Sequence, residues 1–288
     1  MKIYLLKVRD VCQPNRQKFV YPKSNIDFGI EQDFHLYLLQ SNFLVNDPNE
    51  ADWHYLPVYW TRWHLNHDYG KRGISELNHL VNEAIIDDRK TFTVCQYDDG
   101  TLINLGNTKL FLASRKSDFG VDVPLLCKSH KKPFFNQVKC FKASFVGRLE
   151  THPIRMQMSK ELSDRSDVKI INGQLSSRGF VKMVLKSYLA LSPRGYGGSS
   201  FRFFEAMQLG VVPLLIGDID TRPFKNFLPW DEVSIYIKDP DELNGVLNNI
   251  TNEELLQMGV NASHMYENHL KYQKWCHYVI KELNENVL

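Results

Sequence analysis

The sequence predicts an α/β protein built from two Rossmann-like domains that face a cleft. Segments with strand character alternate with segments of helical apolar spacing, and this alternation is typical of parallel sheets. It is interrupted once, at the lysine-rich residues 127–140, which we interpret as a linker. We therefore expect a first domain over residues 1–135, a second domain over residues 141–265, and a C-terminal helix within residues 266–288.

The first domain is expected to contain more strands than helices. Short apolar runs identify the strands, and apolar residues three or four positions apart identify the helices. The expected strands are 4–8, 52–58, 91–96, 109–113 and 121–126, and the expected helices are 30–44 and 74–86.

In the second domain, strands and helices alternate more regularly. One or two aromatic-rich helices are expected after residue 253. The expected strands are 143–147, 168–172, 188–192, 211–216 and 233–237, and the expected helices are 153–163, 178–187, 201–209 and 239–249.

Composition restricts the class of protein. The chain has 288 residues, 43% hydrophobic and 24% charged, as in ordinary soluble globular proteins. Its net charge of +2, with scattered lysines and arginines, gives no electrostatic reason to expect a nucleic-acid partner. No run approaches the roughly 20 apolar residues that span a bilayer, so no transmembrane segment is expected.

Cysteine usage indicates a reducing compartment. The five cysteines are odd in number, widely spaced and without a C-x-x-C pair, which argues against a disulfide framework and a zinc site. The first residues are too short an apolar run, and too charged, for a signal peptide. Both observations favour a cytoplasmic location.

The most informative segment runs from Ser192 to Gly210. It contains a loop with three glycines at positions 195, 197 and 198, and then a short helix that begins after serine and ends at glycine. Backbone amides of such a loop, together with a helix N-terminus, form a typical phosphate-binding site. Arg202 and Glu205 share one face of this helix, so a surface ion pair beside a packing loop is the alternative interpretation.

Several motifs in this chain resemble those of the exostosin family of glycosyltransferases. Pro193-Arg194-Gly195, Ser200-Phe201-Arg202 and Glu205 are similar to the family's "PRG" loop and "SFR-x-x-E" helix. Further matches occur in the same order over most of the chain. They are Ile30-Glu31, Asp47-Pro48-Asn49-Glu50-Ala51-Asp52, Tyr55-Leu56-Pro57-Val58-Tyr59, Ser144-Phe145-Val146-Gly147-Arg148-Leu149, Arg222-Pro223-Phe224 and Leu228-Pro229-Trp230.

The resemblance implies the GT-B architecture and an inverting transfer of sugar from a UDP-sugar to a hydroxyl of a glycan acceptor. Charge aimed at the departing diphosphate contributes most in such chemistry. We expect Arg148, Arg202 and the helix start at Ser199 and Ser200 to bind the phosphates. The resemblance also implies that Arg194 belongs to this site and that Glu205 binds the ribose. It further implies that no cofactor is required and that the last helix packs on the first domain.

The general base is expected in the first domain. Asp98 follows a strand and precedes Gly100, where the family shows "D-x-G". A loop carboxylate at the carboxyl edge of a sheet suits general-base work, although a turn aspartate that bonds its own backbone fits the same pattern. The family's preceding "DH" pair is absent, because Lys90 and Thr91 stand there. The reserve candidates are Asp99, His64 and Asp68.

An aromatic cluster follows the second strand. It consists of Tyr59, Trp60, Trp63 and His64. Aromatic rings stack on sugars, so the cluster is a candidate acceptor site, with core packing as the alternative.

Asp218-Ile219-Asp220 forms a D-x-D motif after a strand. In a GT-A-like transferase such carboxylates would hold Mn²⁺, for which oxygen ligands are suited. Because the motif lies downstream of a phosphate loop that already supplies positive charge, we interpret it as a turn and expect no metal. Two other functions stay open: a non-catalytic exostosin-like partner subunit, and a nucleotide-sugar enzyme of different chemistry such as an epimerase.

Animal and plant members of the resembled family are usually Golgi proteins with an N-terminal anchor helix. This chain shows no such helix, so we expect a bare catalytic unit of the microbial or viral type.

Overall fold

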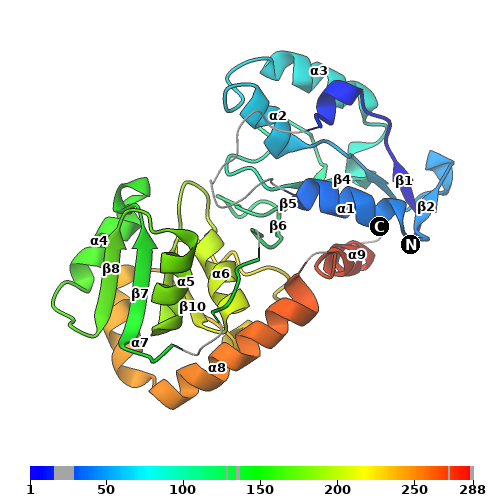
Figure 1. Ribbon diagram of the computed structural model, residues 1–288. Helices are drawn as coiled ribbons and strands as arrows, with labels where there is room; N and C mark the ends of the chain where they lie inside the picture. Colours follow the sequence, from blue (N-terminus) through cyan, green and yellow to red (C-terminus); the bar gives the residue numbers. More distant parts are fainter. Residues whose placement is uncertain (16–28, 128, 134–136, 272, 286–288) are drawn as a thin grey trace. The chain divides into compact units, whose positions relative to one another are not determined.

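The computed structural model describes residues 1–15, 29–127, 129–133, 137–271 and 273–285. The chain divides into two compact units (Figure 1): unit 1 comprises Met1–Pro124 and Tyr272–Leu288, and unit 2 comprises Leu125–Lys271. Each contains one sheet of parallel strands with helices packed on it. The predicted α/β class is therefore confirmed for each half of the chain.

The two units meet in sequence at Pro124, before the lysine-rich segment that we interpreted as a linker. The described part of residues 127–140 belongs to unit 2. Residues 128 and 134–136 of that segment lie outside the described residues.

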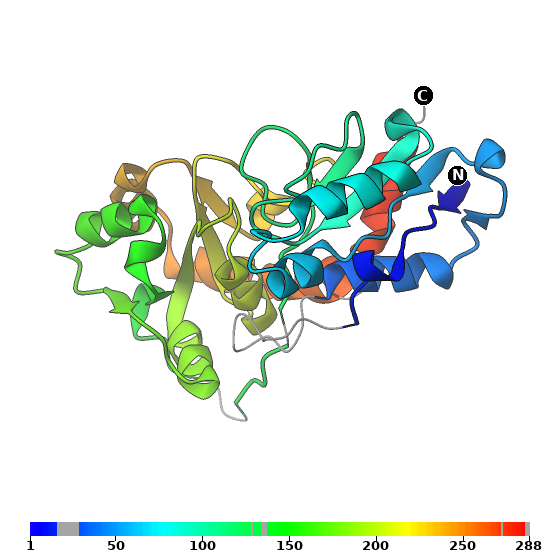
Figure 2. The same ribbon diagram turned by 90° about the horizontal axis from the view of Figure 1, so that it is seen from above.

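Unit 1 has a sheet with the strand order β2-β1-β3-β4-β5-β6, and every described pairing is parallel. Its strands are β1 (Ile3–Leu5), β2 (Leu44–Val45), β3 (Trp53–Tyr55), β4 (Thr91–Cys95), β5 (Lys109–Leu112) and β6 (Val121–Asp122). Its helices are α1 (Ile30–Leu39), α2 (Trp60–Asn66), α3 (Ile74–Ala84) and α9 (Cys276–Asn284). Figure 2 shows α9, in red, within this unit although it is the last helix of the chain.

Side chains of β4 alternate between the two faces of this sheet, as the period of two requires. Phe92 packs edge-on against Phe34 of α1, whose ring also lies 5.9 Å from that of Trp275, just before α9. The next residue, Thr93, accepts a 2.9 Å hydrogen bond from Nε1 of Trp60 in α2. Thus α1 and the chain before α9 cover one face, and α2 covers the other.

Unit 2 has a parallel sheet with the strand order β11-β10-β9-β7-β8. Its strands are β7 (Phe141–Gly147), β8 (Val168–Asn172), β9 (Ser187–Pro193), β10 (Val212–Ile216) and β11 (Ile235–Ile237). Its helices are α4 (Pro153–Glu161), α5 (Ser177–Leu185), α6 (Phe201–Leu209), α7 (Leu243–Asn249) and α8 (Asn252–Met265), and α8 continues into a π-helical turn at Tyr266–Leu270.

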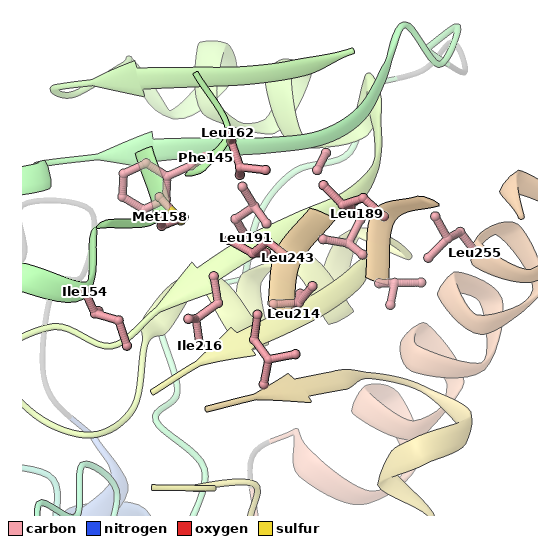
Figure 3. Close-up of a cluster of buried hydrophobic side chains, with 14 of the residues drawn as sticks. Phe145, Ile154, Met158, Leu162, Leu189, Leu191, Leu214, Ile216, Leu243 and Leu255 are labelled. Carbon is pink, nitrogen blue, oxygen red and sulfur yellow. The ribbon is translucent and has the colours of Figure 1, made fainter. Parts of the chain in front are cut away.

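Strand β9 separates two layers of core in unit 2. Leu189 and Leu191 pack in a cluster with Met158 of α4 and Leu243 of α7, as Figure 3 shows. Ala190, between them in sequence, faces a second cluster that contains residues of α5 and α6. Both faces of β9 are buried, which explains its nearly uninterrupted apolar sequence.

Two elements differ from the expected ones, the first because of a nearby side chain and the second because of a distant one. The helix expected over residues 30–44 ends at Leu39, because Oγ of Ser41 donates a 2.7 Å hydrogen bond to the carbonyl of Leu38. The chain then forms the short strand β2. Helix α2 was not predicted, since its N-terminus is held by Glu31, about thirty residues earlier in the chain.

All five cysteines are free thiols, four of them buried and Cys140 exposed, as their spacing predicted. Within the described parts of the chain, no helix combines the length and the apolar character needed to cross a membrane.

Candidate functional site

The site begins where β7, β9 and β10 end. These strands are parallel neighbours, so their carboxyl ends lie at one edge of the sheet of unit 2. Arg148 follows β7, Arg194 follows β9, and Asp218 comes shortly after β10. Ligands of open α/β sheets bind at this edge, so the topology brings the predicted phosphate ligands to the expected place.

Helix α6 starts beside this edge with its N-cap side chain unused. Ser200 has extended backbone angles and is 3% exposed, yet its hydroxyl makes no capping hydrogen bond. The Oγ atom is buried without a hydrogen-bond partner among the described residues. Ser199, the residue before it, is also buried. A buried hydroxyl beside the free amides of a helix N-terminus is an arrangement that an anion would satisfy.

Arg194 is held within the loop that precedes α6. Its backbone N–H donates a 2.9 Å hydrogen bond to the carbonyl of Ile216, which ties the loop to the end of β10. Its guanidinium pairs with Asp218, while Nε is buried without a partner among the described residues. Arg194 therefore keeps one donor for a further acceptor.

Arg148 and Arg202 have different environments. Arg148 is exposed, and its guanidinium makes no hydrogen bond or ion pair within the described chain. The guanidinium of Arg202 lies 5.1 Å from the ring centroid of Phe145 and donates from Nε to the carbonyl of Val146. A Cβ atom at Gly147 would lie 2.7 Å from Cζ of Arg202, so glycine is needed for this close approach.

Glu205 lies one turn further along α6 and is 9% exposed. Its Oε1 lies 2.8 Å from Nε2 of His130, and the ring of His130 packs against Phe180. The backbone N–H of His130 also donates to Oε1 of Gln208 at 3.1 Å. The bonds described for Arg202 and Glu205 thus lead to Val146 and His130, not to each other.

Cys127, His130 and Glu205 form one of the two groups of potential metal ligands in the described chain, with ligand atoms within 4.8 Å of one another. Hydrogen bonds already connect this group, since Gln208 donates to Sγ of Cys127 at 3.8 Å and His130 bonds Glu205. Burial raises the pKa of the Cys127 thiol, and the charge of Glu205 raises it further. The second group, the exposed Asp239, Asp241 and Glu242, lies at a helix start where Asp239 and Glu242 form a capping box.

Each carboxylate of the D-x-D motif pairs with an arginine. Asp218 bonds Arg194, and Asp220 accepts from Nη2 of Arg222 at 2.9 Å. Burial raises the pKa of Asp220, but the bonds from Arg222 outweigh it and hold the pKa below its usual value. The two carboxylates thus neutralise guanidinium groups.

The candidate bases of unit 1 lie after β4 and α2. Asp98 is half-buried in the turn after β4, and the exposed Asp99 pairs with Lys116. Asp68 is exposed, with a left-handed backbone at φ 54°. His64 is fully buried, and burial lowers the pKa of its imidazole to about 4.

The aromatic cluster is divided between surface and core. Tyr59 is half-buried, and its hydroxyl lies 2.9 Å from Nδ1 of His35. Trp60 is 0% exposed and Trp63 is 2% exposed, with the Trp63 ring stacked 3.9 Å from that of His67. Of the four predicted acceptor residues, Tyr59 has the most accessible ring.

Several buried charged groups, among them Arg155 and Glu31, were not predicted as functional. Arg155 of α4 binds backbone carbonyls beside the predicted phosphate ligands, and Glu31 of α1 binds the start of α2 in unit 1. Glu31 was noted only as part of the family resemblance, and no local pattern marks Arg155.

Oε1 of Glu31 is the common acceptor of three donors: Thr61 N at 3.1 Å, Thr61 Oγ1 at 2.8 Å and Gln96 N at 3.0 Å. Burial raises the pKa of this carboxyl from 4.5 to about 7. Because the donors converge on one oxygen, the carboxyl can carry a proton on Oε2 and keep its main bonds.

This raised pKa predicts an unusual pH dependence of stability. The Glu31 carboxyl contributes most to the free energy of unfolding when it is protonated. This contribution is complete below the pKa of the unfolded state and is lost as pH rises through the folded pKa near 7. Relative to Glu31→Gln, which cannot titrate, the wild type should lose roughly 3 kcal/mol of unfolding free energy between about pH 4.5 and 8. Urea unfolding of both proteins across this range measures the difference, and parallel pH profiles would contradict the raised pKa.

Comparisons with known proteins identify a family domain that lies mostly within unit 2. Residues 121–253 match the Exostosin GT47 domain. A 74-residue stretch is 32% identical to the probable β-1,4-xylosyltransferase IRX10 of Arabidopsis thaliana, covering 25% of this chain and 18% of that protein. An alignment 321 residues long, gaps included, relates the chain to the exostosin-1 homolog of Caenorhabditis elegans at 19% identity. It covers 94% of this chain and 81% of the relative.

Among solved structures, AviGT4, a glycosyltransferase involved in avilamycin A biosynthesis, aligns with a TM-score of 0.43 and 11% identity. The alignment covers 99% of this chain and 98% of AviGT4.

The match of residues 121–253 to the Exostosin GT47 domain supports the resemblance that the signature motifs show to the exostosin family. The chain covers less than a fifth of the length of the first curated relatives that it matches, with 18% and 17% for two of them.

Proposed function

We propose that the chain is an inverting glycosyltransferase that moves a sugar from a UDP-sugar to a hydroxyl of a glycan acceptor. The observation that carries the proposal is the convergence of arginines and a helix start at one edge of the sheet of unit 2. Arg148 and Arg194 follow neighbouring strands there, and Ser200 places an unpartnered buried hydroxyl at the start of α6. A diphosphate satisfies both features, because it carries two charges and many acceptor oxygens.

The buried carboxylate of Glu205 supports a ribose contact. It lies on α6 and is already oriented by the bond from His130. A carboxylate accepts hydrogen bonds from sugar hydroxyls, and its orientation before binding lowers the entropic cost of recognition. Arg202, held against Phe145 and Gly147, supplies further positive charge.

In the proposed reaction, the acceptor hydroxyl transfers its proton to Asp98 while its oxygen attacks the anomeric carbon of the sugar. The bond between that carbon and the diphosphate breaks, and UDP leaves with the electron pair. Arg148, Arg194 and Arg202 stabilise the charge that develops on the diphosphate. A single displacement of this kind inverts the configuration at the anomeric carbon.

The names of the relatives suggest which donors to test first. They include a probable xylosyltransferase and probable glucuronosyltransferases. UDP-xylose and UDP-glucuronate therefore lead a panel that UDP-galactose and UDP-N-acetylglucosamine complete. A donor that binds only the folded state raises the melting temperature.

Release of free UDP from the same panel tests catalysis. We expect one donor both to raise the melting temperature and to be consumed when a glycan acceptor is added. Binding without consumption would indicate a non-catalytic partner subunit. Conversion of the donor into another UDP-sugar would indicate an epimerase.

We further propose that transfer needs no metal ion. Asp218 and Asp220, the carboxylates that a GT-A-like enzyme would use for Mn²⁺, are paired with Arg194 and Arg222. Activity should therefore survive dialysis against EDTA, measured as the initial rate of UDP release. Complete loss of this rate, restored by Mn²⁺, would instead assign Asp218 and Asp220 to a metal site.

A further inference from the structure

Arg155 is a buried arginine at the phosphate site that the proposed reaction does not use directly. It lies in the first turn of α4 and is 4% exposed. A buried guanidinium must have its donors bonded, because an unpaired buried charge costs several kcal/mol. The identity of its acceptors therefore shows what the side chain does.

Three of these acceptors are backbone carbonyls from two separate parts of the chain, the residue after β7 and the residues at the end of β9. Nε donates to the carbonyl of Arg194 at 2.9 Å, and Nη2 donates to that of Pro193 at 3.3 Å. Nη1 donates to the carbonyl of Arg148 at 3.0 Å. One planar guanidinium thus connects the residue after β7 with the end of β9 and the residue that follows it.

The neighbouring residues allow this connection. The guanidinium lies 5.7 Å from the ring centroid of Phe145, which covers it from the side of β7. A Cβ atom at Gly195 would lie only 3.1 Å from Nη2 of Arg155. Glycine at this position leaves room for the guanidinium beside the loop after β9.

Arg155 also contributes positive charge at this edge of the sheet. Burial lowers the pKa of His152, and the positive charges of Arg194 and Arg155 lower it further, against the opposing effect of Asp218. Arg155 donates to backbone carbonyls, which are neutral and do not cancel its charge. Its positive charge can therefore still attract a nearby anion.

We infer that Arg155 is a positioning residue that holds the two loops carrying Arg148 and Arg194 at the spacing a donor diphosphate requires. This inference rests on the proposed function, because it assigns the diphosphate to that edge. Lysine cannot replace it, because an ammonium group lacks the planar fork that reaches three carbonyls in two separate parts of the chain.

The test compares UDP with uridine, which lacks the diphosphate, as ligands of the full chain. Arg155→Lys should weaken UDP by about tenfold or more, while the affinity for uridine stays within about twofold of wild type. A merely structural role would weaken both ligands alike. Calorimetric titration gives the affinities, and a melting curve checks the fold.

Arg165→Lys is the matched control, since Arg165 also makes several hydrogen bonds in unit 2, but to Asp167 and Asn248. It should bind UDP like the wild type. An unchanged UDP affinity in Arg155→Lys, or an equal loss of UDP and uridine, would overturn the inference while leaving the proposed function standing. Failure of the wild type to bind any nucleotide would reject the proposed function itself, and the inference with it.

If Arg155→Lys does not fold, Gly195→Ala addresses the same contact. The added methyl would lie 3.1 Å from Nη2 of Arg155, so the guanidinium must shift by a few tenths of an ångström, while every charge is kept. We expect a selective loss of UDP affinity of about threefold or more. Wild-type UDP affinity in this variant would contradict a positioning role.

Discussion

Replacement of Asp98 by asparagine is expected to lower the turnover number by a factor of about 10² or more, with donor affinity nearly unchanged. The proposed role of Asp98 is to take the proton of the acceptor hydroxyl, a step that does not involve UDP. Asparagine keeps the size and the hydrogen-bonding shape of the side chain, so a turn role of Asp98 should persist. Initial rates at saturating donor and acceptor measure the effect, and UDP titration measures the affinity.

The neighbouring aspartate provides a close control. Asp99 is exposed and pairs with Lys116, so Asp99→Asn should leave the turnover number within about twofold of wild type. If Asp98→Asn keeps the full rate while Asp99→Asn loses it, the base is Asp99. If both variants keep the full rate, His64 and Asp68 come next, although the buried ring of His64 is poorly placed to meet a substrate.

Much of the fold follows from patterns that are local in sequence. Strands of a parallel sheet with helices on both faces are continuous apolar runs, and Val212–Ile216 is such a run in which every residue is buried. The glycine loop and the serine before α6 mark the strand-to-helix turn that carries the proposed phosphate site. Because parallel strands end at one edge, this turn also predicts that Arg148 and Arg194 come together.

The parts that the sequence did not predict depend on partners far away in the chain. Arg155 bonds carbonyls, which every residue possesses, and one of them is 39 positions away. No residue type therefore marks its role. Helix α2 depends in the same way on Glu31, whose carboxylate receives the donors of Thr61.

Trp60 shows a different limit of sequence reasoning. A tryptophan after a strand suits a sugar-stacking surface as well as a core, since its ring is apolar and its N–H is polar. In the structure, Thr93 accepts the bond from that N–H, and Trp60 is completely buried. The deciding feature is a threonine hydroxyl 33 positions away.

The second large effect is expected at the proposed donor site, as a loss of affinity for UDP. Arg202→Ala should weaken UDP by about 10- to 100-fold, because a hydrogen bond to a charged group contributes roughly 1.5–3 kcal/mol. The fold should persist, since alanine favours the helical conformation and the main structural loss is the bond to the carbonyl of Val146. Titration with UDP gives the affinity, and the shift of the melting temperature with UDP provides a second measurement.

Arg178 offers a matched control for this variant. It occupies the second position of α5, as Arg202 occupies the second position of α6, and it is exposed. Arg178→Ala removes the same charge from the same position of a neighbouring helix start, so general effects of net charge and of the helix dipole are matched. We expect Arg178→Ala to bind UDP like the wild type. Equal affinities in the two variants would show that Arg202 does not contact the donor, and the positive charge at the diphosphate would then come from Arg148 and Arg194.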